Sequence, residues 1–177
     1  MGLTILGLAA VWLAMAADAR AQEPTLELAV KATYLYKLAP FVTWPATVLG
    51  DPTAPLAICV QGVDPFGAIL DRAVAGQGVG SHPIQVRRLA RIDAHSGCQI
   101  AFVGGSPAQS AAQALAQVDE AAVLTVTGEA ATPRDHGIVH LRLVGGKVRF
   151  SIDASQAEES GLAISSKLLA LAVQVKR

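Results

Sequence analysis

The sequence predicts a single α/β domain with a mixed, mostly parallel β-sheet, helices on both faces of the sheet and an antiparallel hairpin near the C-terminus. Two strand-helix-strand patterns follow one another between residues 56 and 126, and a Gly-Gly pair separates two alternating segments after residue 137. No repeat, low-complexity segment or linker divides the 177 residues, of which 52% are hydrophobic. A chain of this size and composition can bury one substantial core.

The first 21 residues predict a signal peptide. Residues 3–17 form an apolar stretch, and Ala19 and Ala21 then form an A-x-A cleavage signal. This stretch is shorter than the roughly 20 residues that a membrane-spanning helix requires, which favours cleavage over a permanent anchor. We therefore expect export to the bacterial periplasm and a mature domain over residues 22–177.

The next segment predicts the first helix, over residues 25–39. Leu28 and Leu35 recur at helical spacing along it, and Pro40 disfavours continuation of the helix. A short aromatic segment over residues 41–45 then leads into a loop.

A parallel pair of strands follows the loop. Residues 56–60 form an apolar run typical of a strand that is buried on both faces, and residues 83–89 alternate as a strand does. Between them, Asp64 can cap a helix that has Pro65 at its first position and ends at Gly76. This strand-helix-strand unit implies a parallel pair with a right-handed crossover.

The same pattern repeats once more. Residues 99–103 and 122–126 predict strands on either side of an Ala- and Gln-rich helix that ends near Val118. Ser106 is expected to cap this helix, with Pro107 at its first position. The sheet therefore gains two further parallel strands.

The C-terminal part predicts a hairpin and a helix. Residues 138–144 and 147–152 alternate on either side of Gly145-Gly146, a pair that a tight hairpin turn favours. The chain is then expected to end in a helix that begins near Ser165, with an apolar face made of Leu168, Leu169, Leu171, Ala172 and Val175.

Charge and cysteine content narrow the class of partner and the compartment. The chain has 14 Lys and Arg residues against 14 Asp and Glu residues, so no overall field would attract nucleic acid. Cys59 and Cys98 are its only cysteines, and an exported protein enters a compartment in which such a pair can oxidise. A disulfide between them is expected, with two buried free thiols as the alternative.

The residues carry no pattern that predicts an enzyme, a metal centre or a bound cofactor. The sequence has no G-x-S-x-G elbow, and Ser106 stands where a helix cap is expected rather than a nucleophile. The four histidines are too scattered for a zinc motif. His136 and His140 would share one face of a strand, so a weak surface metal site is the alternative interpretation.

One turn is a candidate for anion binding. Gly104, Gly105 and Ser106 join a predicted strand to a predicted helix N-terminus, where free N–H groups and the helix dipole favour an anion. The P-loop lysine and a full G-x-G-x-x-G pattern are both missing. A weak anion site is therefore one interpretation of this turn, and a conformational requirement for glycine is the other.

An aromatic cluster is the second candidate for binding. Half of the Phe, Tyr and Trp residues fall within one short segment, as Tyr34, Tyr36, Phe41 and Trp44. Tyr and Trp combine a large apolar area with a polar tip, which suits contact with a partner or an aromatic ligand. Such a cluster can equally be a satellite core, and the sequence leaves both interpretations open.

Three short motifs stand in a characteristic order after the signal peptide. They are VKATYLYK at residues 30–37 leading to FVTWP at residues 41–45, GVDPFG at residues 62–67, and ISSKLL at residues 164–169. Together they resemble the YfiR family of periplasmic proteins. The resemblance spans nearly all of the mature chain, so residues 22–177 are expected to form one YfiR-like domain.

The resemblance implies a periplasmic regulator that binds the sensing region of an inner-membrane diguanylate cyclase and holds it inactive, which lowers cyclic di-GMP and restrains biofilm formation. It also implies a homodimer, and release by an outer-membrane lipoprotein or by redox damage to disulfides. Cys59 and Cys98 look like one family disulfide pair, whereas a second pair of some members has no counterpart here. The alternative function is a periplasmic small-molecule binding module that passes a ligand signal to a membrane receptor or sensor protein.

Overall fold

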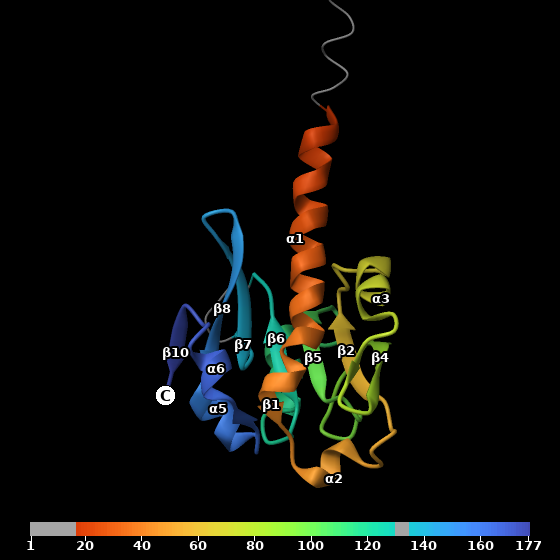
Figure 1. Cartoon of the computed structure of the whole chain (residues 1–177), viewed down its shortest axis with the longest axis vertical. Coiled ribbons are helices and arrows are strands. Elements are labelled where there is room, and N and C mark those ends of the chain that lie inside the picture. Colours follow the sequence, from red (N-terminus) through yellow and green to blue (C-terminus); the bar gives the residue numbers. More distant parts are fainter. Residues whose placement is uncertain (1–16, 130–134) are drawn as a thin grey trace, which may run out of the picture.

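The computed structural model describes residues 17–129 and 135–177, with side chains from Leu26 onward. Within these ranges, eight strands form one sheet in the order β10-β8-β7-β6-β5-β2-β4-β3, and β1 and β9 form a separate two-stranded ribbon (Figure 1). In the large sheet, the β7–β8 and β3–β4 pairs are antiparallel and the other neighbours are parallel. The predicted mixed, mostly parallel α/β fold is confirmed.

The first predicted strand-helix-strand unit is present, with a shorter helix than expected. It consists of β2 (Leu56–Gly62), α3 (Ala68–Val74) and β4 (His82–Leu89), and β2 runs parallel to β4. The prediction that Asp64 caps the helix is wrong, because its carboxylate accepts the N–H groups of Phe66 and Gly67 in a turn that precedes α3. A short strand, β3 (Gly78–Val79), adds an unpredicted antiparallel edge.

The second unit comprises β5 (Ile100–Gly105), α4 (Ala111–Gln117) and β6 (Leu124–Thr127). The prediction that Ser106 caps the helix is wrong. Ser110 is the N-cap: its hydroxyl accepts the Gln113 N–H, and the Gln113 side chain accepts the Ser110 N–H. Because this reciprocal capping box satisfies both N–H groups at Ser110, the helix begins four residues later than the proline suggested.

The predicted hairpin is confirmed as β7 (Val139–Val144) and β8 (Lys147–Asp153). Gly145 and Gly146 form its turn with φ of +56° and +72°, a backbone conformation that disfavours other residues at both positions. The helix α5 (Ala154–Glu159), which sequence reasoning missed, follows β8 directly and has Asp153 as its N-cap.

The predicted C-terminal helix is wrong beyond its first turn. Ser165 caps a helix as expected, but α6 (Ser166–Leu169) is a single turn that is preceded by β9 (Ala163–Ile164). The chain then extends as β10 (Gln174–Lys176) and pairs with β8. The free backbone edge of β8 explains this outcome, because it offers hydrogen-bond partners that apolar periodicity does not reveal.

The N-terminal elements are α1 (Ala17–Lys37), η1 (Ala39–Phe41), β1 (Val42–Thr43) and α2 (Ala46–Leu49). The α-helix ends before Pro40 as predicted, two residues earlier than expected, and a 3₁₀ turn takes the place of its last residue. The signal peptide predicted over residues 1–21 lies mostly outside the described residues, and its cleavage stays a prediction. Among the helices that the structure describes, none is both long and apolar enough to cross a membrane.

Helices cover both faces of the sheet, as predicted. Alternate residues of β2 and β5 face opposite sides: Ile58 and Phe102 pack in the core under α1 and α3, whereas Cys59 and Ala101 pack in a smaller core with α4. The chain passes from β2 to β4 through α3, and from β5 to β6 through α4. The central part of the sheet is therefore doubly wound.

Candidate functional site

Trp44 belongs to the core rather than to the surface. Its side chain is only 6% exposed, and its indole N–H donates to the carbonyl of Gln99 at 3.2 Å. A ring in this position cannot offer a partner a large contact area. The core interpretation of the aromatic cluster is thus correct for Trp44, and the interpretation of Trp44 as a partner contact is wrong.

The other three aromatic side chains are half-buried. The ring of Tyr34 packs edge-on against Phe150 of β8 with centroids 5.6 Å apart, and the Nζ atom of Lys37 lies 5.1 Å from the centre of the Tyr36 ring. Phe41 packs against the core. Tyr34, Tyr36 and Phe41 therefore combine a structural contact with solvent-accessible area, and each stays a candidate contact.

The solvent side of α1 carries a row of apolar and aromatic side chains. Leu26 is 67% exposed and Val30 is 36% exposed, and a spacing of four residues places them on one side of the helix with Tyr34. A shallow hollow of about 360 Å³ follows this row. We define the α1 surface as Leu26 together with the residues that line the hollow, which are Ala29, Val30, Thr33, Tyr34 and Lys37.

The α1 surface stands clear of the rest of the fold at its N-terminal end. Figure 1 shows α1 rising past the upper end of the sheet, with the β7–β8 hairpin projecting in the same direction at some distance from it. The hairpin ends in two more apolar residues, Leu143 and Val144, and each of them is exposed. The row of apolar side chains on α1 is the larger of the two exposed apolar groups, which makes it the stronger candidate for a protein-binding surface.

The first and third sequence motifs meet in space. Val42 pairs with Ile164 and Thr43 pairs with Ala163 in the β1–β9 ribbon, and the Ser165 N–H donates to the carbonyl of Phe41 at 2.9 Å. The FVTWP and ISSKLL segments thus fix the C-terminal end of α1 to the region that follows α5.

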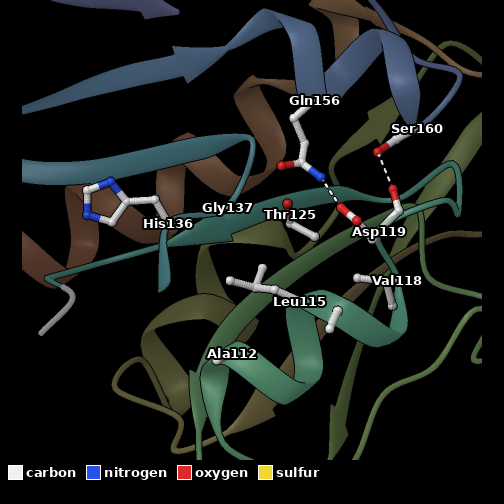
Figure 2. A pocket seen from close by; sticks show the side chains of 10 residues that line it. Ala112, Leu115, Val118, Asp119, Thr125, His136, Gly137, Gln156 and Ser160 are labelled. Atoms are coloured by element: carbon white, nitrogen blue, oxygen red, sulfur yellow. Dashed lines mark hydrogen bonds between the residues drawn. The ribbon is translucent and has the colours of Figure 1, made fainter. Parts of the chain in front are cut away.

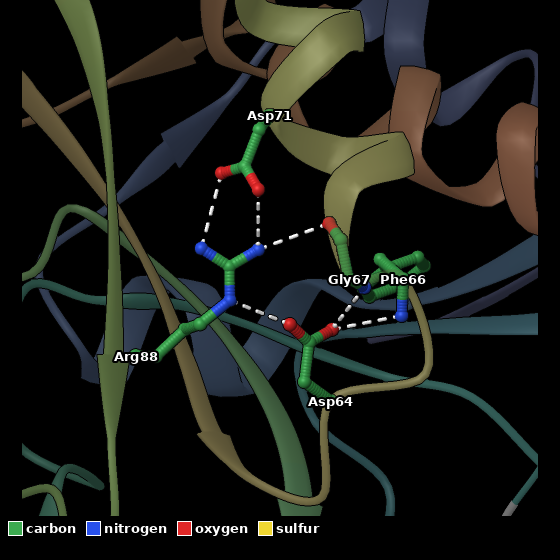
Figure 3. A network of polar contacts seen from close by, with 5 residues as sticks. All are labelled: Asp64, Phe66, Gly67, Asp71 and Arg88. Atoms are coloured by element: carbon green, nitrogen blue, oxygen red, sulfur yellow. Dashed lines mark hydrogen bonds and ion pairs between the residues drawn. The ribbon is translucent and has the colours of Figure 1, made fainter.

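The second motif is held by a network of polar contacts around Arg88. Its Nε donates to Asp64 at 2.7 Å, and its two terminal nitrogens donate to Asp71 at 3.0 and 2.9 Å (Figure 3). The same guanidinium also donates to the carbonyl of Gly67 at 2.9 Å. Arg88 of β4 therefore connects the turn after β2 to α3, which fixes the position of α3 on the sheet.

The contacts of this network shift the pKa values of Asp64 and Arg88. Burial acts to raise the pKa of Asp64, but the hydrogen bonds from Arg88, Phe66 and Gly67 together hold it below its usual value. The hydrogen bonds with Asp71 and Asp64 raise the pKa of Arg88. The network is consequently charged on both sides at neutral pH.

The turn at Gly104, Gly105 and Ser106 lacks the helix N-terminus on which the predicted anion site depended. The Gly105 N–H donates to the Gln61 side chain, and the Ser106 N–H donates to the Gln109 carbonyl. A Cβ atom at Gly104 would lie 2.3 Å from the carbonyl oxygen of Val63. Close approach of two backbone segments therefore accounts for glycine at this position.

The predicted disulfide between Cys59 and Cys98 is confirmed. The two Cα atoms are 5.8 Å apart, and both side chains are buried in the core under α4. The bond joins the middle of β2 to the segment that enters β5, so it crosslinks two neighbouring strands of the sheet.

A histidine pair lies on the sheet face that points away from α1. The His140 ring is 6% exposed and stacks on the His136 ring with centroids 3.8 Å apart, and its Nδ1 lies 3.0 Å from the Thr127 hydroxyl. Burial, followed in size by the charge of His136, lowers the pKa of His140 to about 4. His140 is therefore neutral at physiological pH.

Two connected hollows border this pair. The smaller hollow has a volume of about 220 Å³ and lies between α4 and α5, with Thr125 among the residues that line it. Figure 2 shows that the side chains of Gln156 and Asp119 point toward one another at this hollow and are joined by a hydrogen bond. The larger, about 600 Å³, extends over β7, β8 and β10. Both are lined by His136, Gly137 and Gln156, so they form one groove.

The stacked rings do not form a metal centre with other side chains. Among residues 17–129 and 135–177, no group of three or more His, Cys, Asp or Glu side chains could hold a metal ion. The groove itself was not predicted, because its walls come from α4, α5 and β10, and two of these elements were missed. The pairing of His140 with a threonine hydroxyl has no local sequence signal.

Comparison with protein families identifies a family for this chain. A family model described as YfiR/HmsC-like covers residues 28–173 of the chain. This range includes all three motifs, the disulfide and most of the α1 surface and of the groove. No curated protein matches the chain.

Proposed function

Because the chain belongs to the YfiR/HmsC-like family, we propose that it binds the sensing region of an inner-membrane diguanylate cyclase from the periplasmic side and holds the cyclase inactive. Members of this family are periplasmic, non-enzymatic regulators of diguanylate cyclases. The family match is the observation that carries the proposal. The buried disulfide supports it, since such bonds persist in an oxidising compartment.

The α1 surface is the region that we assign to this contact. Leu26 and Val30 are exposed on the side of α1 that faces away from the core, whereas Ala32 and Leu35 are fully buried on the other side. An amphipathic helix that exposes apolar residues on its outer side can dock into an apolar groove of a partner. The sensing region of the cyclase is the occupant that family membership supports.

Regulation of this kind needs no chemistry in the regulator. A protein that binds the inactive conformation of a cyclase more tightly than the active one shifts the equilibrium by the ratio of the two affinities. To change an equal mixture into 99% inactive cyclase, the inactive conformation must be bound about a hundredfold more tightly. That ratio corresponds to about 2.7 kcal/mol, which a small number of buried apolar contacts can supply.

Copurification tests the proposal directly. The mature protein, immobilised through its C-terminus, should retain a membrane diguanylate cyclase from a detergent extract of the membranes of its own cells. The Leu26→Glu variant should retain at least tenfold less cyclase, because it places a charge in the apolar contact. Leu171→Glu is the matched control, since Leu171 has a similar exposure of 64% but follows α6. Retention of no cyclase by the parent protein would contradict the proposal.

A further inference from the structure

The sheet face that points away from α1 gathers positive charge along β7 and β8. Val139 and Leu141 pack in the core under α1, so His140 and Arg142 point to the opposite face. The strand register places Arg142 directly across from Arg149. The hairpin thus places two arginines at opposed positions on the same face of the sheet.

This arrangement is unfavourable unless an anion compensates it. Like charges directly opposite one another on an antiparallel pair destabilise the sheet. The nearby Lys176 is already neutralised, because its Nζ lies 2.7 Å from the Asp153 carboxylate. In the part of the chain that the structure describes, neither Arg142 nor Arg149 has an ion-pair partner.

One donor on this face is also buried without a partner. The Nε atom of Arg142 is inaccessible to solvent and makes no hydrogen bond with any described residue. A polar sheet face is ordinarily hydrated, but a buried guanidinium N–H without an acceptor costs free energy. Among the described residues this donor has no acceptor, and a ligand in the groove would contact the remaining nitrogens of the same guanidinium, since the Arg142 side chain lines the groove.

His140 supplies a second feature of the same groove. The Thr127 hydroxyl accepts the Gly137 N–H at 3.0 Å, which leaves its own O–H to donate to Nδ1 of His140. A neutral His140 then carries its proton on Nε2. The groove beside it has a volume of about 600 Å³, within the range of small-molecule sites.

We propose that the groove over β7, β8 and β10 binds a small molecule that carries a phosphate group, with the phosphate oxygens against Arg142, which lines the groove, on the side where Arg149 stands opposite it in the strand register. A phosphate monoester carries close to two negative charges at neutral pH and several acceptor oxygens, which suits two opposed guanidinium groups. The uncharged part of the ligand lies against polar residues of the groove, which are Ser151, Gln156 and Gln174. This site is separate from the α1 surface, on the opposite side of the sheet.

Titration of the ¹⁵N-labelled mature protein with inorganic phosphate and with methyl phosphate tests the proposal. The Nε–H resonance of Arg142 should shift in a saturable manner, with a Kd below about 1 mM for methyl phosphate. Arg142→Gln should weaken binding by about tenfold or more, because a charge-assisted hydrogen bond is lost. Arg149→Gln should weaken it in the same direction, whereas Arg91→Gln, which removes an exposed charge elsewhere, should change the Kd less than twofold.

Three results would overturn the proposal. The first is the absence of saturable binding up to about 10 mM of either phosphate probe, and the second is an equal loss of affinity in the Arg142 and Arg91 variants. The third is equal binding of acetate, which would assign the site to carboxylates instead. The same titration is repeated with phosphatidylglycerol vesicles. If the vesicles shift the Nε–H resonance of Arg142 and methyl phosphate does not, the ligand is a membrane surface, and this result would contradict a soluble ligand.

Discussion

The indole N–H of Trp44 donates to the backbone carbonyl of Gln99, and this single contact joins the aromatic segment after α1 to the entry of β5. The Gln99 side chain extends the connection, since it accepts the Ala57 N–H and donates to the Val48 carbonyl. The segment around residues 44–48, the start of β2 and the entry of β5 therefore meet at one buried position. Trp44 therefore contributes to the fold, whereas the α1 surface is the region that we propose for contact with a partner.

Replacement of Trp44 by Ala should destabilise the protein rather than remove a contact. A buried aromatic side chain costs about 3–5 kcal/mol when it is truncated to Ala, and the Gln99 carbonyl would also lose a donor. Urea denaturation followed by circular dichroism measures this loss. Thr43→Ala, at the exposed neighbouring position, should change the free energy of unfolding by less than about 0.5 kcal/mol. Wild-type stability of Trp44→Ala would show that the ring is not part of the core.

Removal of the Cys59–Cys98 bond should lower stability by a comparable amount. The two cysteines are 39 residues apart, and closure of a loop of that length contributes about 4 kcal/mol in the chain-entropy model. A Cys59→Ala, Cys98→Ala double variant should unfold at a lower urea concentration than the oxidised parent protein. The same shift should appear when the parent is reduced. If reduction leaves the midpoint unchanged, the bond does not contribute to stability.

The two carboxylates that contact Arg88 should differ in their contributions. Asp64 accepts two backbone N–H groups as well as Arg88, so Asp64→Ala should cost about 1–2 kcal/mol. Asp71 is about half exposed, and Asp71→Ala should cost less than about 1 kcal/mol. Thermal or urea denaturation of both variants, measured side by side at pH 7, decides between this order and its reverse.

The same network should make stability sensitive to acid. The pKa of Asp64 is lowered in the folded protein, so the unfolded chain binds its proton first as the pH falls. The stabilisation is fully present above the usual carboxyl pKa and is lost as the pH falls through the lowered value. The difference in stability between the parent and Asp64→Ala should therefore shrink in that acidic range. A constant difference would contradict this account.

His140 should produce a separate loss of stability on acidification, in a pH range above the one in which Asp64 acts. Its pKa is about 4 in the folded protein against 6.5 for a free histidine, so the unfolded chain binds a proton between these values and stability falls as the pH decreases from 6.5 to 4. This group alone should cost about 2 kcal/mol at pH 5 relative to pH 8. The charged groups that act on it are His136, Glu129, Arg142 and Lys31.

Urea denaturation at pH 5 and pH 8 measures this effect. His140→Gln should have a smaller difference between the two pH values than the parent, whatever its absolute stability. His95→Gln, which removes an exposed histidine, should retain the parental difference. Equal pH dependence of the parent and His140→Gln would assign the acid sensitivity to other groups.

The sequence predicts the central strands well for a physical reason. The apolar runs at residues 56–60 and 99–103 are buried on both faces, and only a central parallel strand has that requirement. Gly145-Gly146 predicts the hairpin because few other pairs tolerate positive φ at two successive positions. In these cases, local chemistry alone selects the structure.

The elements that were missed depend on partners distant in the sequence. Val175 has the apolar periodicity of a helix, but the free edge of β8 draws residues 174–176 into a strand. Asp64 has the chemistry of a helix cap, but Arg88 and two backbone N–H groups hold it in the preceding turn. The proposed phosphate site depends on the register that places Arg149 opposite Arg142, which no local pattern specifies.

The concentration of cyclic di-GMP in cells tests the regulatory account most directly. Deletion of the gene should raise cyclic di-GMP, and expression of the parent protein from a plasmid should lower it again. Leu26→Glu should fail to lower it, while Leu171→Glu, with a similar exposed fraction, should restore repression at an equal periplasmic protein level. Unchanged cyclic di-GMP after deletion, under conditions in which the protein is expressed, would contradict the assignment of this chain as a cyclase regulator.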